Sequence, residues 1–126
     1  MNARNGVIAA GVLGALGVVA GAFGAHALRG SIDAGNLEIW QTAARYQQIH
    51  AIALLAVSIW AQQDPRPLRR LSITLFTVGI IVFAGTLYPL ATGLGPRMLG
   101  AITPIGGLCL IGGWVALVIE GLRLRR

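Results

Sequence analysis

A small group of ionisable and hydrogen-bonding side chains interrupts the otherwise apolar stretches of this chain. The group is drawn from separate parts of the sequence and comprises His26, Arg45, Tyr46, His50, Tyr88 and Thr103. Arginine and histidine side chains suit an anionic lipid headgroup or a small polar solute. Polar groups inside membrane-spanning segments are costly and usually face the bundle interior or water. We therefore interpret the group as a candidate ligand-binding site.

The two histidines allow other interpretations. Two imidazoles at similar depth on neighbouring helices could ligate a b-type haem or a metal ion. Haem needs two ligands that face each other with space between them. The first apolar stretch is instead rich in glycine, which indicates close helix packing, and the chain has 2 histidines in all. A structural role is the remaining alternative, with His26 hydrogen-bonded at the membrane interface and His50 bonded to a carbonyl group or to Tyr88. We predict no metal site and no cofactor.

The residue patterns typical of enzymes do not occur in this sequence. It has no paired carboxylates, no nucleophile next to a base and no glycine-rich phosphate loop. Asp33 and Glu38 could be acidic partners for the histidines, but no pattern fixes their position. We therefore predict no catalytic residue and no enzymatic activity.

The composition indicates a membrane protein. Hydrophobic residues make up 56% of the chain and charged residues 11%, against about 25% charged residues in soluble domains. The net charge of +6 comes from arginine alone. The arginines lie between apolar runs without interleaved aromatic residues, which argues against a nucleic-acid partner and favours contacts with anionic lipids. Cys109 lies in an apolar run and is interpreted as a packing residue.

Four stretches lack any Asp, Glu, Lys or Arg, and a membrane-spanning helix needs roughly 20 apolar residues. These stretches are Asn5–Leu28, Tyr46–Gln63, Leu71–Pro96 and Met98–Ile119. They predict an all-α fold, a single-domain four-helix transmembrane bundle over residues 1–126, with spans at 6–28, 44–63, 71–91 and 99–120. The first stretch, with Arg4 before it and Ala25-His26-Ala27 after it, also resembles a secretory signal peptide. Its apolar run exceeds the typical signal core of about 7–15 residues, so we expect a retained helix.

The connections carry turn signals. Two prolines in Asp64-Pro-Arg-Pro67 cannot lie inside a helix, so spans two and three should form an antiparallel hairpin. Asn36 is a plausible N-cap. From there we expect a short interfacial helical segment that runs into span two, with Trp40 at the headgroups; a separate amphipathic helix is the alternative. Near the end of the chain, Glu120 should pair with Arg123 or with water.

Arginine counts in the short connections predict the orientation, because cytoplasmic loops are enriched in positive charge. With four spans, both termini and the middle connection lie on one side. That side holds Arg4, Arg66, Arg69, Arg70, Arg123, Arg125 and Arg126, and the other holds Arg29, Arg45 and Arg97. We therefore predict that both termini are cytoplasmic.

Glycine residues repeat at helical spacing in two of the spans. The predicted helix-packing positions are Gly14, Gly17, Gly21 and Gly24 in span one, and Gly106 and Gly113 in span four. Helices in lipid associate by close backbone approach, which small residues permit. The same glycine faces could contact membrane lipids, a second copy of the chain or a partner membrane protein.

Polar residues are distributed unevenly across the membrane in this topology. All four spans contribute polar groups to the outer half, whereas the inner half is predicted to be apolar. This favours a lipid- or partner-binding accessory protein. The alternative is an oligomeric transporter or channel for ions or small solutes, because a pore within one protomer would need polar residues through its whole depth.

Several motifs, in their order along the chain, resemble a known family. They are Ala22-Phe-Gly-Ala-His-Ala-Leu28, Trp40-Gln-Thr-Ala-Ala-Arg-Tyr-Gln-Gln-Ile-His50, Phe83-Ala-Gly-Thr-Leu-Tyr88 and Ile102-Thr-Pro-Ile-Gly-Gly107, followed by Trp114. The chain resembles the YgdD-like small inner-membrane proteins, a family of unknown function with a small eukaryotic transmembrane branch. The resemblance covers essentially the whole chain and implies a four-helix, multi-pass protein of the bacterial plasma (inner) membrane, without implying an activity. Ala84 and Thr86 stand where the family pattern usually has serine, so a serine hydroxyl there is not essential.

Overall fold

A computed structural model of the chain describes residues 1–124, so Arg125 and Arg126 of the predicted basic tail lie outside the described residues. The described part forms the helices α1 (Ala3–Phe23), α2 (Ala34–Gln63), α3 (Pro67–Thr92) and α4 (Leu99–Arg123), with a π-helical turn, η1 (Gly24–Leu28), after α1. This confirms the predicted all-α bundle. The predicted spans 44–63, 71–91 and 99–120 lie within α2, α3 and α4, and the span 6–28 lies within α1 continued by η1.

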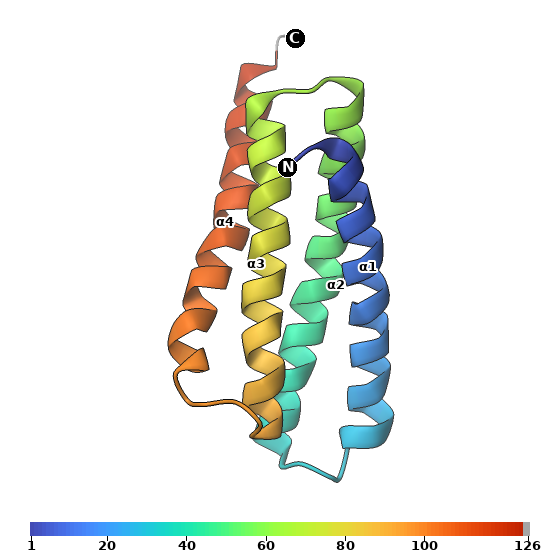
Figure 1. The fold of residues 1–126 in the computed structure, drawn as a ribbon, viewed down its shortest axis with the longest axis vertical. Helices are drawn as coiled ribbons and strands as arrows, with labels where there is room; N and C mark the ends of the chain where they lie inside the picture. Colours follow the sequence, from blue (N-terminus) through green and yellow to red (C-terminus); the bar gives the residue numbers. More distant parts are fainter. Residues whose placement is uncertain (125–126) are drawn as a thin grey trace.

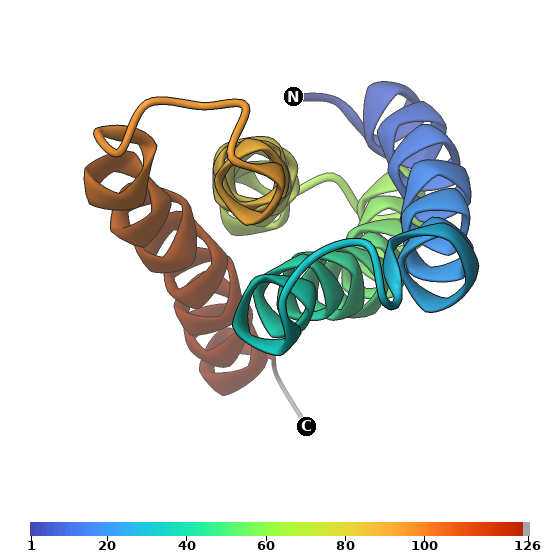
Figure 2. The same cartoon turned by 90° about the horizontal axis from the view of Figure 1, so that it is seen from below.

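The helices pack in the order in which they follow one another along the chain (Figure 1). Seen along the bundle axis, α1 and α4 lie on opposite flanks, with α2 and α3 between them (Figure 2). The N-terminus, the connection after α2 and the end of α4 lie at one end, which we call the terminal end (Figure 1). The connections before α2 and after α3 lie at the other, which we call the loop end. The bundle is therefore an open row whose outer helices do not close against each other.

The helix boundaries follow from local sequence signals. Pro67 occupies the first turn of α3, where its missing N–H leaves no partner unsatisfied. Gly93 ends the same helix at φ 68°, a conformation that costs glycine nothing. Pro104 lies inside α4 near its start. Pro89 likewise lies near the end of α3.

Helix α2 corrects two predictions. Its N-cap is Asp33, whose carboxylate accepts a hydrogen bond from the Asn36 backbone nitrogen at 2.9 Å, so the prediction of Asn36 as the cap was wrong. The helix then continues to Gln63 without a break. This confirms a helical segment that runs into span two, and the alternative of a separate amphipathic helix was wrong. Trp40 does not extend from the bundle but packs within it.

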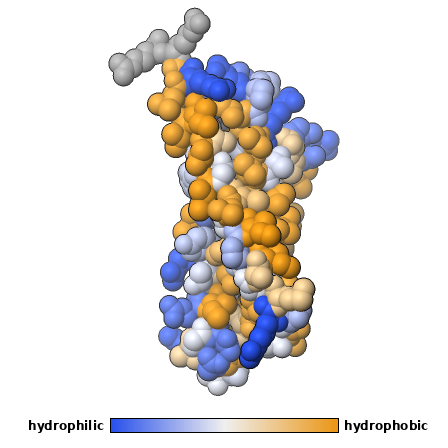
Figure 3. Space-filling view, turned by 90° about the vertical axis from the view of Figure 1, so that its left-hand side faces the viewer, coloured by the Kyte–Doolittle hydropathy of each residue, from blue (hydrophilic) through white to orange (hydrophobic). Residues whose placement is uncertain are grey.

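By length and composition, three of the helices within residues 1–124 could cross a membrane: α1 continued through η1 (Ala3–Leu28), α3 and α4. Helix α2 is longer but more polar. In its middle, Gln47, His50 and Ser58 are buried against the neighbouring helices, whereas its exposed polar residues lie mostly toward its two ends. On the face that carries α4, apolar side chains cover most of the middle, and hydrophilic side chains gather toward both ends (Figure 3).

Glycine sets the separation of the helices on both sides of the core. A Cβ at Gly17 would lie 2.9 Å from Gln48 Cγ, and one at Gly24 would lie 2.6 Å from Trp40 Cδ1. A Cβ at Gly21 would approach Gln48 Nε2 to 3.0 Å, whereas Gly14 has ordinary spacing to Ala51. The structure thus places these predicted glycines of α1 and η1 against α2.

The interface between α3 and α4 is closer still. A Cβ at Gly106 would lie 2.5 Å from the Phe83 backbone nitrogen, and one at Gly113 would lie 2.6 Å from the Phe76 ring. Phe76 belongs to the buried apolar core with Leu54, Ile73 and Leu110. The core therefore lies mainly among α2, α3 and α4.

Candidate functional site

Gln47 is the centre of a hydrogen-bond network in the loop-end half of the bundle. It is buried, its Nε2 donates to the Leu13 carbonyl of α1 at 2.8 Å, and its Oε1 accepts from the Tyr88 hydroxyl of α3 at 2.7 Å. One side chain of α2 therefore links three helices. An amide can do this because it both donates and accepts.

Two further side chains of α2 bind the backbone of α1. Gln48 Nε2 donates to the Gly17 carbonyl at 2.7 Å, and Trp40 Nε1 donates to the Ala20 carbonyl at 2.8 Å. The Trp40 ring also lies 4.5 Å from the Tyr88 ring, centre to centre. The glycines of α1 permit these bonds because they let α2 side chains approach the α1 backbone. The prediction that Trp40 anchors at the headgroups is replaced by this packing role. We call Trp40, Gln47, Gln48 and Tyr88 the hydrogen-bond network.

His50 is buried one turn further into the membrane, and both of its ring nitrogens have partners. Nδ1 lies 2.7 Å from the Tyr46 carbonyl oxygen, and Trp114 Nε1 of α4 donates to Nε2 at 3.1 Å. Because a carbonyl oxygen only accepts, the arrangement assigns the proton to Nδ1 and the acceptor role to Nε2. Neither nitrogen is left free for a haem iron or a metal ion. Of the alternatives for His50, the bond to a carbonyl group is the one observed, and the bond to Tyr88 is not.

Thr103 is buried against Thr86, and their hydroxyl oxygens lie 2.6 Å apart. One hydroxyl donates to the other, and the accepting partner donates its own proton to a carbonyl of its helix, Leu99 for Thr103 or Val82 for Thr86. The pair therefore ties α3 to α4 near the loop end. It presents no unused donor to a ligand.

The structure does not bring the whole predicted site together. His26 on η1 and Arg45 on α2 are exposed, and Tyr46 is 43% exposed with its ring 5.0 Å from the Phe83 ring. Tyr88, which is partly buried, and His50, which is buried, belong to separate sets of contacts. Within residues 1–124, no three His, Cys, Asp or Glu side chains come together as a metal site requires.

A cluster of charged residues at the terminal end was missed from the sequence. Arg69 of α3 is 1% exposed and Glu120 of α4 is 2% exposed. Arg69 Nη2 lies 3.0 Å from Glu120 Oε1, and Arg69 Nη1 donates to the Asp64 carbonyl oxygen at 2.6 Å. The predictions that Glu120 pairs with Arg123 or water and that this half of the bundle is apolar were therefore wrong.

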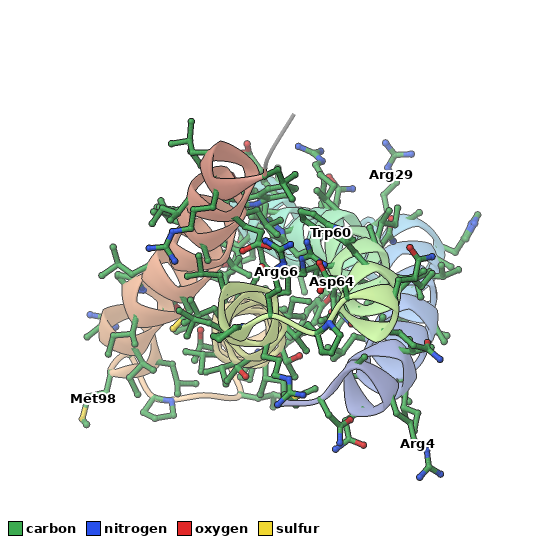
Figure 4. All side chains as sticks on the ribbon, turned by 90° about the horizontal axis from the view of Figure 1, so that it is seen from above. Arg4, Arg29, Trp60, Asp64, Arg66 and Met98 are labelled. Carbon is green, nitrogen blue, oxygen red and sulfur yellow. The ribbon has the colours of Figure 1, made fainter. Side chains whose placement is uncertain are left out.

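Asp64 and Arg66 complete this arrangement, and we call the four residues the ion-pair cluster. The Asp64 carboxylate lies 3.0 Å from Arg69 Nη1 and 2.8 Å from Arg66 Nε. The Arg69 guanidinium carbon lies 3.8 Å from the centre of the Trp60 ring, a favourable cation–π geometry. Figure 4 shows Trp60, Asp64 and Arg66 gathered over the middle of the bundle, whereas Arg4 points outward.

The ion-pair cluster is balanced in charge but not fully hydrogen-bonded. Two arginines face two carboxylates, yet Arg69 Nε and Glu120 Oε1 lack a hydrogen bond of good geometry among the described residues. Burying charges in this way is costly unless they are paired. The cluster therefore fixes the connection after α2 to the end of α4.

An apolar groove runs between α1 and α3, with α2 as its floor. It encloses about 560 Å³. Its lining residues are Leu13, Leu16, Val19, Ala20, Phe23, Trp40, Gln47, Ile80, Ile81, Gly85 and Tyr88. Two members of the hydrogen-bond network that were outside the predicted site, Trp40 and Gln47, thus lie beside the predicted residue Tyr88. We call this space the α1–α3 groove.

The sequence does contain signals for the site residues that the prediction missed. Trp40, Ala44 and Gln47 share one face of α2 by helical spacing, which places Gln47 with the buried residues of that face. Arg69 follows Pro67 closely, so it lies in the first turn of a helix rather than in a loop. Glu120 precedes the end of α4 by about one turn.

Comparison with known proteins identifies relatives over most of the chain. A family model described as a protein of unknown function, DUF423, matches residues 20–107. The chain is 42% identical to a UPF0382 membrane protein of Staphylococcus saprophyticus, over 86% of this chain and 92% of that protein. It is 33% identical to the UPF0382 inner membrane protein YgdD of Escherichia coli, over 100% of this chain and 95% of that protein. No solved structure matches.

Proposed function

Since this chain belongs to the DUF423/UPF0382 family of multi-pass inner-membrane proteins of unknown function, we propose that it is a lipid-binding accessory protein without catalytic activity. Its ligand is a membrane lipid whose hydrocarbon chain lies in the α1–α3 groove. The observation that carries this proposal is the composition of the groove: mostly apolar walls from α1 and α3, with Gln47 of α2 and Tyr88 of α3 as its polar groups.

The groove supports this function because it opens on the side of the helices, which the hydrocarbon core of the membrane surrounds. Small-molecule sites are concave and mostly apolar, with a few placed polar groups. The Tyr88 hydroxyl donates to Gln47, so its oxygen keeps a lone pair that a lipid hydroxyl could use. Phe23 lines the groove near the loop end and leads directly into η1. The exposed His26 and Arg29 therefore lie within about two turns of the groove mouth, where a basic side chain suits an anionic headgroup.

The same proposal includes an orientation with both termini in the cytoplasm. Among the described residues, the terminal end carries Arg4, Arg66, Arg69, Arg70 and Arg123, against Arg29, Arg45 and Arg97 at the loop end. Arg69 is buried in the ion-pair cluster, which leaves Arg4, Arg66, Arg70 and Arg123 against three, and the sequence after Arg123 adds Arg125 and Arg126. A membrane-impermeant thiol reagent applied to intact cells should label Leu94→Cys and not Pro65→Cys, both in a Cys109→Ser background. The reverse labelling pattern would invert the topology.

The groove can be tested with a glycine pair. A side chain at Gly85 would enter the groove without meeting any atom within 4 Å of its Cβ. Gly121 is equally open and lies far from the groove on α4, so Gly121→Leu is a matched control. Native mass spectrometry in mild detergent should show lipid retained by the wild type and by Gly121→Leu, and largely lost from Gly85→Leu. Equal retention in all three proteins would contradict the proposal.

A transporter is less well supported. A pore through one protomer needs polar side chains at every depth, and the middle of this bundle is filled by Leu54, Val57, Ile73 and Phe76. An oligomer could still form a pore between copies. Solute flux into proteoliposomes above the level of empty vesicles would favour that alternative.

A further inference from the structure

Helices α2 and α4 are joined by one polar contact, the bond between His50 and Trp114. Trp114 Nε1 donates to His50 Nε2 at 3.1 Å, and within residues 1–124 no other side-chain hydrogen bond or ion pair links these two helices. Helix α4 otherwise packs mainly on α3. The His50–Trp114 bond therefore holds the middle of α4 against α2.

This bond requires a neutral imidazole. An indole N–H donates but cannot accept, so the ring nitrogen opposite it must carry a lone pair. His50 Nδ1 lies 2.7 Å from the Tyr46 carbonyl oxygen and donates to it, which leaves Nε2 as the acceptor for Trp114. Both nitrogens of an imidazolium are donors. A proton on Nε2 would therefore place two N–H groups opposite each other and break the contact with Trp114.

The surroundings of His50 supply no counter-charge for an imidazolium. The imidazole packs against Tyr46 of α2, Phe76 of α3 and Trp114 of α4, with ring centres 5.8, 5.9 and 6.0 Å away. Of these three side chains only the Tyr46 phenol titrates, and it is neutral at physiological pH. None of the ion pairs among residues 1–124 includes His50. The charged residues of the four helices lie toward the two ends of the bundle: Arg4, Glu38, Arg45, Arg69, Arg70, Glu120 and Arg123.

A hollow beside the Trp114 ring offers space for a released indole. It encloses about 380 Å³ between α2 and α4 and is lined by Ala53, Ala56, Val57, Trp60, Trp114 and Leu117. We call it the α2–α4 hollow. Trp114 is 44% exposed, so its ring can turn into this space without displacing the buried core.

His50 lies within reach of the loop-end side of the membrane. It is six residues into the predicted span 44–63, which corresponds to about 9 Å at about 1.5 Å per residue. Tyr46, one turn nearer the loop end, packs on the imidazole and is 43% exposed. Histidine is the side chain whose charge changes between about pH 5 and 8.

We propose that His50 and Trp114 form a pH-sensitive switch, in which protonation of His50 Nε2 releases the Trp114 indole into the α2–α4 hollow and loosens α4 from α2. Deprotonation restores the bond and holds the two helices together. This inference goes beyond lipid binding in the α1–α3 groove and does not depend on it.

Nuclear magnetic resonance of the full chain in detergent micelles can follow each tryptophan separately, because every indole N–H gives its own ¹⁵N–¹H signal. The Trp114 signal, assigned with Trp114→Phe, should move upfield between about pH 8 and about pH 4, a range that spans histidine titration. The upfield movement reports the loss of the hydrogen bond. Trp40 donates to the Ala20 carbonyl, so its signal should stay constant and serves as the internal reference.

His50→Gln is the matched variant for the proton. The glutamine carbonyl oxygen can accept from Trp114 but does not titrate, so the Trp114 signal should stay constant over the same pH range. A Trp114 signal that is constant in the wild type would overturn the switch. A Trp114 transition that persists in His50→Gln would also overturn it, because another group would then be titrating.

A second variant tests the α2–α4 hollow and keeps the experiment decisive if His50→Gln fails to fold. Ala53→Leu fills the hollow and leaves the indole beside His50, so the Trp114 transition should move to lower pH by about one pH unit, a tenfold loss of proton affinity. The control is Ala101→Leu, at an exposed alanine of α4 that does not line the hollow, and it should leave the transition unchanged. Equal transitions in both variants would overturn release into the hollow.

Discussion

The two ends of this bundle are held together by different chemistry. At the loop end, Gln47, Gln48 and Trp40 of α2 donate neutral hydrogen bonds to backbone carbonyls of α1, and Tyr88 donates to Gln47. At the terminal end, the connection between α2 and α3 is tied to α4 by buried charges, with Arg69 between Asp64 and Glu120.

The difference shows at which depth in the membrane each kind of polar contact is tolerated. Interhelical hydrogen bonds inside a membrane contribute modestly, about 0.6 kcal/mol on average. Neutral groups can therefore be placed at depth with little loss if one bond fails. A buried charge that loses its partner costs several kcal/mol, and here the charges lie at helix ends, close to the membrane surface. The loop end can border an open groove, whereas the terminal end is closed by its ion pairs.

Removing one charge should have the largest effect. Glu120→Leu removes the buried carboxylate beside Arg69 and leaves the half-exposed Asp64 as its carboxylate partner, so we expect a loss of about 3 kcal/mol in the free energy of unfolding, the lower end of the range for breaking a buried ion pair. Thermal unfolding in detergent would measure it. The double variant Arg69→Met with Glu120→Leu should recover most of the loss, because a neutral pair needs no partner. Arg70→Met, at an exposed arginine, is the control. An unchanged unfolding temperature in Glu120→Leu would show that the ion-pair cluster does not hold this end.

A smaller effect should come from the close contact between α3 and α4 at Gly106. Gly106→Ala places a Cβ 2.5 Å from the Phe83 backbone nitrogen, so α3 and α4 must separate, at a cost of about 1–3 kcal/mol. The neighbouring Gly107→Ala meets its nearest atom, in the Phe83 ring, at 3.9 Å. It should be neutral or slightly stabilising in the same unfolding measurement. If both variants are destabilised equally, the cause would be the loss of glycine's backbone flexibility and not the close approach of Phe83 to Gly106.

The smallest effect should come from the hydrogen-bond network. Tyr88→Phe removes the hydroxyl that donates to Gln47 Oε1, and we expect a loss of about 0.6–1.5 kcal/mol. The control is Tyr46→Phe, because this tyrosine is largely exposed. If Tyr88→Phe cost as much as Glu120→Leu, the contrast between the two ends would be wrong.

Some of this arrangement was predictable from local signals, and some was not. Pro67 and the apolar runs predicted the helices, and the glycines of α1 lie against α2 as their spacing suggested. Asp33 caps α2 in place of Asn36 because both residue types can cap a helix, and the choice between them depends on backbone direction. The predicted site included Tyr88 and His50, but their partners Gln47 and Trp114 were not identified, since spacing along one helix does not specify which residue of another helix it meets.

The sequence by itself determined four long helices, since uncharged apolar runs in lipid must satisfy their own backbone hydrogen bonds. It also determined that these helices approach closely, because glycine removes the side chains that would keep them apart. Only the tertiary structure decided which polar groups meet. Arg69 lies beside Glu120, and Gln47 lies between Leu13 and Tyr88, because the order and tilt of the packed helices bring distant positions together. The α1–α3 groove is likewise a product of that packing and has no signature in either helix alone.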